Sequence, residues 1–324
     1  MKRILCKLIL LGLPLYIMMG YIAAAPVSYM PVEYSMWREE KDFISKRSTE
    51  GVDEPDPDMI IIGDSRAKSG ILPEMLDQEG GAYNIAIGGC NSIEMYFALE
   101  KYLESHKTPQ KAVVIFAPYH FCDIDNWGQT QTFNYLTCSQ LFRVYCDAAK
   151  SDERALLGEH FFTDVFSYKL RLPNKYLASV YSARLWGRRA ENLEKYRQVR
   201  ADLGYTEFGS EKGNDKANYE THHEVFDLSP LVNLYYQRLL SLAQEKGISV
   251  YVLQAPVNET SDGLITREFR SSFAALMEEV KADHPDFVVE SEIPVFENRY
   301  FGDNNHLNRE GAEKFTALVK EKYF

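Results

Sequence analysis

Residues 59–70 read MIIIGDSRAKSG, an apolar run that ends abruptly at Gly63-Asp64-Ser65. Four consecutive hydrophobic residues followed by glycine predict a buried strand, with the tripeptide at its carboxyl end. Ser65 is then either a nucleophile displayed at the end of a strand or a residue of an ordinary strand-to-helix turn. The tripeptide alone favours the ordinary turn, so the distinction depends on the rest of the chain.

The rest of the chain alternates between strand and helix patterns. Further strands are predicted at residues 82–89, 111–120, 248–256 and 287–291. Helices are predicted at residues 72–80, 92–106, 231–247, 269–284 and 308–324. This alternation predicts an α/β fold with three layers, α/β/α, around a mostly parallel five-stranded sheet. In such sheets ligands collect at the carboxyl ends of the strands.

Two segments lie outside this alternation. Residues 121–229 are rich in Tyr, Phe and Trp, with weak helical segments and no convincing strand. We interpret them as a helical insertion over the carboxyl-terminal edge of the sheet, within a catalytic domain at residues 58–324. Residues 26–57, which end in VDEPDPD, are interpreted as a polar tether.

Residues 1–25 are predicted to be a membrane anchor or a signal segment. Lys2 and Arg3 precede an apolar stretch that only Lys7 interrupts. Its length favours an anchor, which takes roughly 20 apolar residues, while Ala23-Ala24-Ala25 would suit the processing site of a signal peptide. In both cases the positive residues stay in the cytoplasm, so we expect an extracytoplasmic domain, anchored to the cell membrane or secreted after cleavage.

Composition narrows the classes of partner. A net charge of −11 argues against nucleic acid, which needs a basic surface. Residues 143–200 nevertheless hold twelve Lys or Arg and seven Asp or Glu, so this segment would suit an anionic polymer or lipid head groups. The five cysteines lack metal-site spacing, and we expect neither a metal nor a cofactor. A Cys138–Cys146 disulfide and free thiols both remain open.

Two further stretches carry residues suited to acyl chemistry. Asp303 and His306 lie three residues apart just before the last predicted helix. A nucleophilic serine needs a base to take its proton and a carboxylate to orient that base. Gly88 and Gly89 end the second predicted strand, where a backbone N–H unobstructed by a side chain can approach an oxyanion.

The stretches IIGDSRA, NIAIGG and GDNNHLNREGA resemble blocks one, two and five of the SGNH/GDSL hydrolase superfamily, over residues 58–120 and 230–324. This resemblance implies Ser65 as the nucleophile, His306 as the general base and Asp303 as its orienting partner. It also implies an oxyanion hole formed by the N–H groups of Ser65 and Gly89, with Gly88 as the neighbouring alternative.

The third block of the family, Gly-x-Asn-Asp, is missing after the third predicted strand, where the chain reads FAPYHF. The KGND at residues 212–215 lies inside the insertion with no strand before it. The oxyanion hole is therefore either incomplete or filled by Tyr119, His120 or Asn91. One missing donor typically costs about 10²–10³ in rate.

The missing block, the anchor and the insertion resemble a membrane-anchored branch of this family, which acts in lipoteichoic acid D-alanylation and alginate-type exopolysaccharide O-acetylation. The stretch LQAPVNE also resembles that branch, and Asn258 within it, with Tyr119 and His120, is a candidate for substrate binding. The resemblance implies an acyl-serine that relays acetyl or D-alanyl, supplied by a membrane-bound O-acyltransferase, to a polysaccharide or teichoic acid. A carbohydrate esterase and a catalytically idle scaffold subunit of an acylation complex are the alternatives.

Overall fold

Five short strands form the main sheet, in the order β2-β1-β3-β4-β6. The structure is a computed structural model, and it describes residues 2–47, 56–76, 81–124, 126–184 and 186–324. The strands are β1 (Met59–Gly63), β2 (Ala82–Asn84), β3 (Lys111–Ile115), β4 (Ser249–Val252) and β6 (Val288–Val289). Every neighbouring pair is parallel, so the carboxyl ends of all five lie at one edge. The predicted mostly parallel, five-stranded sheet is confirmed.

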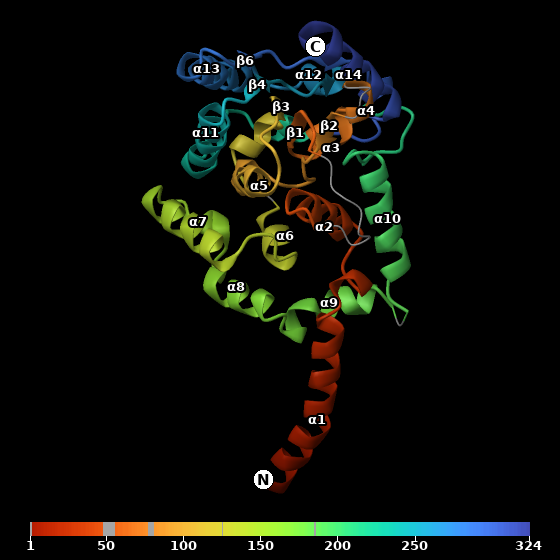
Figure 1. Cartoon of the computed structure of the whole chain (residues 1–324). Helices are drawn as coiled ribbons and strands as arrows, with labels where there is room; N and C mark the ends of the chain where they lie inside the picture. The colour runs from red at the N-terminus through yellow and green to blue at the C-terminus, as the bar shows by residue number, and fades with distance from the viewer. Residues whose placement is uncertain (1, 48–55, 77–80, 125, 185) are drawn as a thin grey trace.

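Helices cover both faces of this sheet (Figure 1). Ile60 and Ile62 of β1 belong to one apolar core, together with residues of α5 (Ser92–Ser105), α11 (Pro230–Glu245) and α13 (Arg267–Asp283). Ile61 belongs to a second core, with α3 (Ser65–Gly70), α4 (Pro73–Leu76) and α14 (Arg309–Tyr323). A strand buried on both faces has a continuous apolar sequence, which is why the run at residues 59–62 is unbroken. The three-layer α/β/α architecture is confirmed.

The remaining elements surround these layers. The other helices are α1 (Lys2–Ala23), α2 (Glu33–Ile44), α6 (Trp127–Thr132), α7 (Cys138–Lys150), α8 (Phe161–Lys169), α9 (Pro173–Ser182), α10 (Arg189–Ala201) and α12 (Glu259–Asp262). Short 3₁₀ turns are η1 (Pro26–Ser28), η2 (Pro118–Phe121), η3 (Arg154–Leu157), η4 (Tyr219–His222) and η5 (Asn298–Tyr300), and β5 (Val257–Asn258) pairs with β7 (Val295–Phe296). Of the helix predicted at residues 72–80, α4 forms one turn, and residues 77–80 lie outside the described residues.

The polar tether predicted at residues 26–57 is wrong for its described part. Helix α2 lies in the core, with Trp37 and Phe43 fully buried, and the Phe43 ring stacks on Tyr83 at 3.6 Å. Two of its acidic residues, Glu39 and Glu40, are buried as well, where Tyr83 donates a hydrogen bond to Glu39 and Tyr135 donates to Glu40. Because these partners are distant in sequence, the charged residues of α2 on their own indicated a segment exposed to solvent. Residues 48–55 of the predicted tether lie outside the described residues.

The position predicted for the insertion is only partly right. Much of its helical part packs on α2 rather than over the strand ends: the rings of Phe133 and Tyr135 contact Trp37, and Tyr196 of α10 donates to Asp42. Residues 203–223 do reach the strand ends, as described below. The described part of residues 121–229 contains helices and no strand, which agrees with the sequence.

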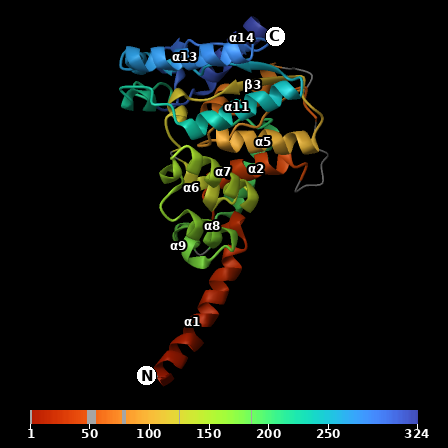
Figure 2. The ribbon, with the colours of Figure 1, turned by 90° about the vertical axis from the view of Figure 1, so that its left-hand side faces the viewer.

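Helix α1 projects away from the body, beside α9 (Figures 1 and 2). It is long and apolar enough to cross a membrane, and it alone meets this condition among the described helices. The four cysteines whose side chains are described are free thiols. Cys138 and Cys146 lie eight residues apart on α7, about 12 Å along the helix axis, which exceeds the reach of a disulfide.

Candidate active site

Ser65 follows the turn at the carboxyl end of β1, which is an interior strand of the sheet. Gly63 has φ +151°, and a Cβ there would lie 1.8 Å from the carbonyl oxygen of Ile115 on β3, so the turn requires glycine. Asp64 caps α3 by accepting the Arg66 N–H at 2.8 Å. Ser65 is therefore the first residue of α3, partly exposed, with its hydroxyl at the edge where ligands bind.

Asp64 and His120 form a buried pair beneath this turn. Asp64 Oδ2 accepts hydrogen bonds from His120 Nδ1 at 2.6 Å and from the Ala117 N–H at 2.6 Å. Burial by itself raises the pKa of Asp64, but the attraction and hydrogen bond of His120 and the Ala117 N–H outweigh it, so the pKa lies below its usual value. Asp64 is fully buried and satisfied, and it ties the end of β1 to η2 after β3.

Asp303 and His306 form the second carboxylate–imidazole pair, on the loop before α14. Asp303 accepts from His306 Nδ1 at 2.8 Å and from the backbone N–H groups of Asn305 and His306 at 2.8 and 2.7 Å. Burial raises the pKa of Asp303. The hydrogen bond and charge of His306 and the two backbone N–H groups lower it by more, so the pKa lies below its usual value. Nδ1 of His306 is thereby fixed as the donor, while Nε2 is buried and has no partner among the described residues.

Two side chains hold the His306 loop against the Ser65 turn. Arg66, next to Ser65, donates through Nη2 to Asn305 Oδ1 at 3.2 Å and to Glu220 Oε2 at 2.5 Å. Phe208 contacts both sides of the site, because its ring lies 4.9 Å from the His306 ring and would touch a Cβ on Gly88. The His306 imidazole therefore lies beside the turns after β1 and β2, although no hydrogen bond joins its Nε2 to the Ser65 hydroxyl in this structure.

The turn after β2 carries the predicted oxyanion donors. Gly89 has φ +79°, and a Cβ there would crowd the Asn126 side chain. The turn sits against β1, since the Ile87 N–H donates to Gly63 O at 3.0 Å. Within the described residues, the N–H groups of Ser65 and Gly89 donate to no other group and are available to an oxyanion.

The other predicted donors and binding residues have different surroundings. Asn91 caps α5 with its side-chain oxygen, which accepts the Ile93 N–H at 2.8 Å. Tyr119 lies at the site, with the Arg66 guanidinium over its ring and the Tyr219 ring against its edge. The roles of Asn91, Tyr119 and His120 in binding or oxyanion stabilisation stay predictions.

Asn258 does not serve the predicted role in substrate binding. Its side chain is fully buried, and its amide donates to the carbonyl oxygens of Asn214 and Lys216 at 3.3 and 2.9 Å. Its oxygen accepts the Ser261 N–H and caps α12. Both polar groups of the Asn258 side chain therefore have partners within the protein, and neither is exposed.

Sequence reasoning missed the residues that assemble the site. Arg66 and Asn305 belong to the quoted stretches GDSRA and GDNNH, so a basic residue and an amide beside the reactive groups were the available signal. Glu220 and Phe208 come from the insertion, where no motif marks them. Among the described residues, no group of three or more His, Cys, Asp or Glu is placed to hold a metal ion.

No protein-family model matches the chain, and no curated protein matches it either.

Proposed function

We propose that this protein is an extracytoplasmic, serine-dependent O-acyltransferase of the SGNH/GDSL type, which transfers acetyl or D-alanyl to a cell-envelope polysaccharide or teichoic acid. One observation carries the proposal. The Asp303–His306 pair fixes an imidazole with an unpartnered Nε2 beside the strand end that displays Ser65. A carboxylate, an oriented imidazole and a hydroxyl supply the three roles of a serine nucleophile.

In the first half-reaction His306 Nε2 takes the Ser65 proton as the serine oxygen attacks the carbonyl carbon of the acyl donor. The N–H groups of Ser65 and Gly89 stabilise the oxyanion of the tetrahedral intermediate. The carbon–oxygen bond to the leaving group then breaks, and His306 returns its proton to that leaving oxygen. Asp303 holds the tautomer and stabilises the charged imidazole throughout.

In the second half-reaction a hydroxyl of the acceptor attacks the acyl-Ser65 ester while His306 takes its proton. The new ester forms, and the proton returns to Ser65. Water attacking the same ester would make the protein an esterase. Helix α1 anchors the domain to the membrane in this proposal, where a membrane-bound O-acyltransferase supplies the acyl group.

A fluorophosphonate probe tests the nucleophile in the full-length protein. Wild type should be labelled, and Ser65→Ala should abolish labelling. Ser69→Ala is the matched control, since Ser69 lies on the same short helix and its hydroxyl donates to the Ser65 carbonyl. We expect this control to remain labelled. Labelling that persists in Ser65→Ala would refute the assignment, and a wild type without labelling would favour the idle scaffold.

Transfer and hydrolysis are separated by the fate of the acyl group. The protein is incubated with an activated acetyl ester and an oligosaccharide, and mass spectrometry follows Ser65 and the sugar. We expect an acetyl adduct on the peptide with Ser65 and its movement to the oligosaccharide. Release of acetate alone would contradict transfer and support the esterase.

A further inference from the structure

Helices α8 and α9 expose a row of apolar side chains that the fold does not bury. Phe162, Phe166 and Leu170 follow one another at intervals of four residues, as do Leu177 and Tyr181, so each set lies along one side of its helix. Trp186 comes next along the chain and is 93% exposed. We call these six residues the basal face.

The six residues of the basal face are separate from the side chains that α8 and α9 bury within the fold. Other positions of α8 and α9 are already buried, among them Phe161 and Tyr176. Tyr176 packs edge-on against Tyr29, close to the end of α1. Soluble monomers rarely leave this many large apolar side chains of two neighbouring helices uncovered, so their exposure indicates an interaction surface.

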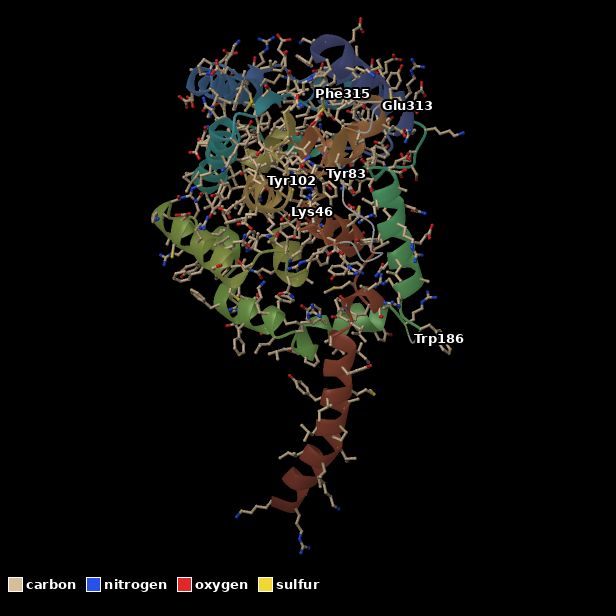
Figure 3. The ribbon with its side chains drawn as sticks, in the orientation of Figure 1. Lys46, Tyr83, Tyr102, Trp186, Glu313 and Phe315 are labelled. Atoms are coloured by element: carbon tan, nitrogen blue, oxygen red, sulfur yellow. The ribbon has the colours of Figure 1, made fainter. Side chains whose placement is uncertain are left out.

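The basal face is located where α1 leaves the body. Arg171, between α8 and α9, donates to the carbonyl oxygen of Ala24 at 3.1 Å, and the Arg188 N–H donates to Ser28 O at 2.7 Å. Both views place α8 and α9 at the end of the body from which α1 emerges (Figures 1 and 2). Trp186 points away from the body at this end (Figure 3).

The charge of this end has the opposite sign to that of the whole chain. Residues 161–189 contain six Lys or Arg and one Asp, whereas the net charge of the chain is −11. The single Asp164 is paired with Lys175. Arg184 and Arg189 are exposed beside the apolar row. Apolar and aromatic side chains bordered by arginines are typical of helices that lie in a membrane interface.

We propose that the basal face lies on the outer surface of the bilayer that α1 crosses, with its aromatic side chains among the head groups and its arginines on anionic lipids. The lipid surface is the occupant that fits best, because the face continues directly from the end of a membrane-length helix and its charge complements anionic head groups. The inference depends on the membrane anchor of the proposed function and not on its chemistry.

The basal face would also set the position of the active site. Helix α10 runs from this end towards the strand ends (Figure 1), and its 13 residues span about 20 Å. Beyond α10, the Thr206 N–H donates to Lys68 O on α3. Contact of the basal face with lipid would therefore hold Ser65 at a fixed height above the bilayer.

Tryptophan quenching by doxyl-labelled lipids tests the contact in the full-length protein reconstituted into vesicles of phosphatidylcholine and phosphatidylglycerol. Trp37 and Trp127 are buried in the domain, and α1 contains no tryptophan. We expect head-group-proximal doxyl lipids to quench wild-type fluorescence clearly and Trp186→Phe to remove most of that quenching. Equal quenching in both proteins, or none in wild type, would overturn the proposal and leave a second copy or a membrane protein as the occupant.

A second pair of variants keeps Trp186 in place. Phe162→Ser with Phe166→Ser should reduce the quenching at least severalfold, while Phe142→Ser on α7, an equally exposed phenylalanine outside the basal face, should leave it unchanged. Quenching in the Phe162/Phe166 double variant as strong as in wild type would overturn the proposal. Wild-type protein that fails to float with vesicles would reject the anchor and this inference together, whereas Ser65 labelling tests the chemistry separately.

Discussion

The two carboxylates of the site have different tasks because they have different surroundings. Asp64 is fully buried and is satisfied by His120 and two backbone N–H groups. The Asp303 side chain is about one third exposed and orients an imidazole whose other nitrogen is unpartnered. Asp64 of the GDS stretch thus holds the strand end in place, and Asp303 near the C-terminus orients the His306 imidazole.

The Arg66–Glu220 pair is the buried link between the site and the insertion, with side chains 2% and 0% exposed. We predict that Glu220→Met costs about 3–5 kcal/mol in the free energy of unfolding, because it leaves a buried guanidinium without its charge partner. Arg66→Met combined with Glu220→Met should recover most of this loss, since two apolar side chains need no partner. Chemical denaturation of the three proteins measures both effects, and strictly additive losses would contradict the pairing.

At the scale of elements, the sequence was most informative where burial is continuous. The run at residues 59–62 and the second strand's double glycine predicted β1, β2 and the turns that carry Ser65 and Gly89. These patterns are visible within a short stretch of sequence: a continuous apolar run marks a strand covered on both faces, and glycines mark turns in which a Cβ would collide. The sheet and its layers could therefore be predicted from the chain.

The same reasoning failed where distant residues neutralise charge. Helix α2 contains six charged residues among its 12, which indicated solvent, yet Glu39 and Glu40 are buried against tyrosines of β2 and of the insertion. Asn258 looked available for substrate and instead serves two backbone carbonyls of the insertion. Phe208 and Glu220 complete the site from a segment that carries no motif. No local pattern encodes these pairings.

Glu40 makes the docking of α2 sensitive to pH. Burial raises its pKa to about 8, with the Tyr135 hydrogen bond and Lys68 opposing that rise. The folded protein holds this proton more tightly than the unfolded chain does. The contribution of Glu40 to the free energy of unfolding is therefore fully present at acid pH and is lost as the pH rises towards 8. We predict that the free energy of unfolding of Glu40→Gln, relative to that of wild type, increases by roughly 3–4 kcal/mol from pH 5 to pH 8.

Urea unfolding at both pH values measures this difference in stability. Glu33→Gln is the matched control, because Glu33 lies on the same helix and is exposed. It should show no pH-dependent difference from wild type. Parallel pH profiles for Glu40→Gln and wild type would contradict a protonated, buried Glu40.

At the scale of the whole molecule, charge is separated between two ends. Residues 161–189 are basic, next to α1, and the rest of the chain contains 30 Lys or Arg against 46 Asp or Glu. The segment that borders the site is acidic too, with four exposed Asp or Glu and two exposed Lys between residues 203 and 224. A basic end suits a lipid surface, and an acidic border around Ser65 disfavours an anionic acceptor.

This separation leads to a prediction about the acceptor. We expect acyl transfer to a neutral oligosaccharide to exceed transfer to a glycerol phosphate oligomer by about tenfold at low salt, because the acidic border repels phosphate. Added salt should reduce the ratio of the two rates by increasing the rate of transfer to the glycerol phosphate oligomer, since screening weakens repulsion between exposed charges. Rates of acylated product at low and high salt measure both effects.

A double variant at two exposed positions of this border, Glu207→Gln with Asp215→Asn, tests its charge. This variant should reduce the ratio of the two transfer rates without added salt. Glu278→Gln with Glu279→Gln is the control of equal charge change. It lies near the C-terminal end of α13, next to the amino ends of the strands, because β6 follows that helix in a parallel sheet. Equal rates for both acceptors in wild type, or equal effects of the two double variants, would show that the border does not select the acceptor.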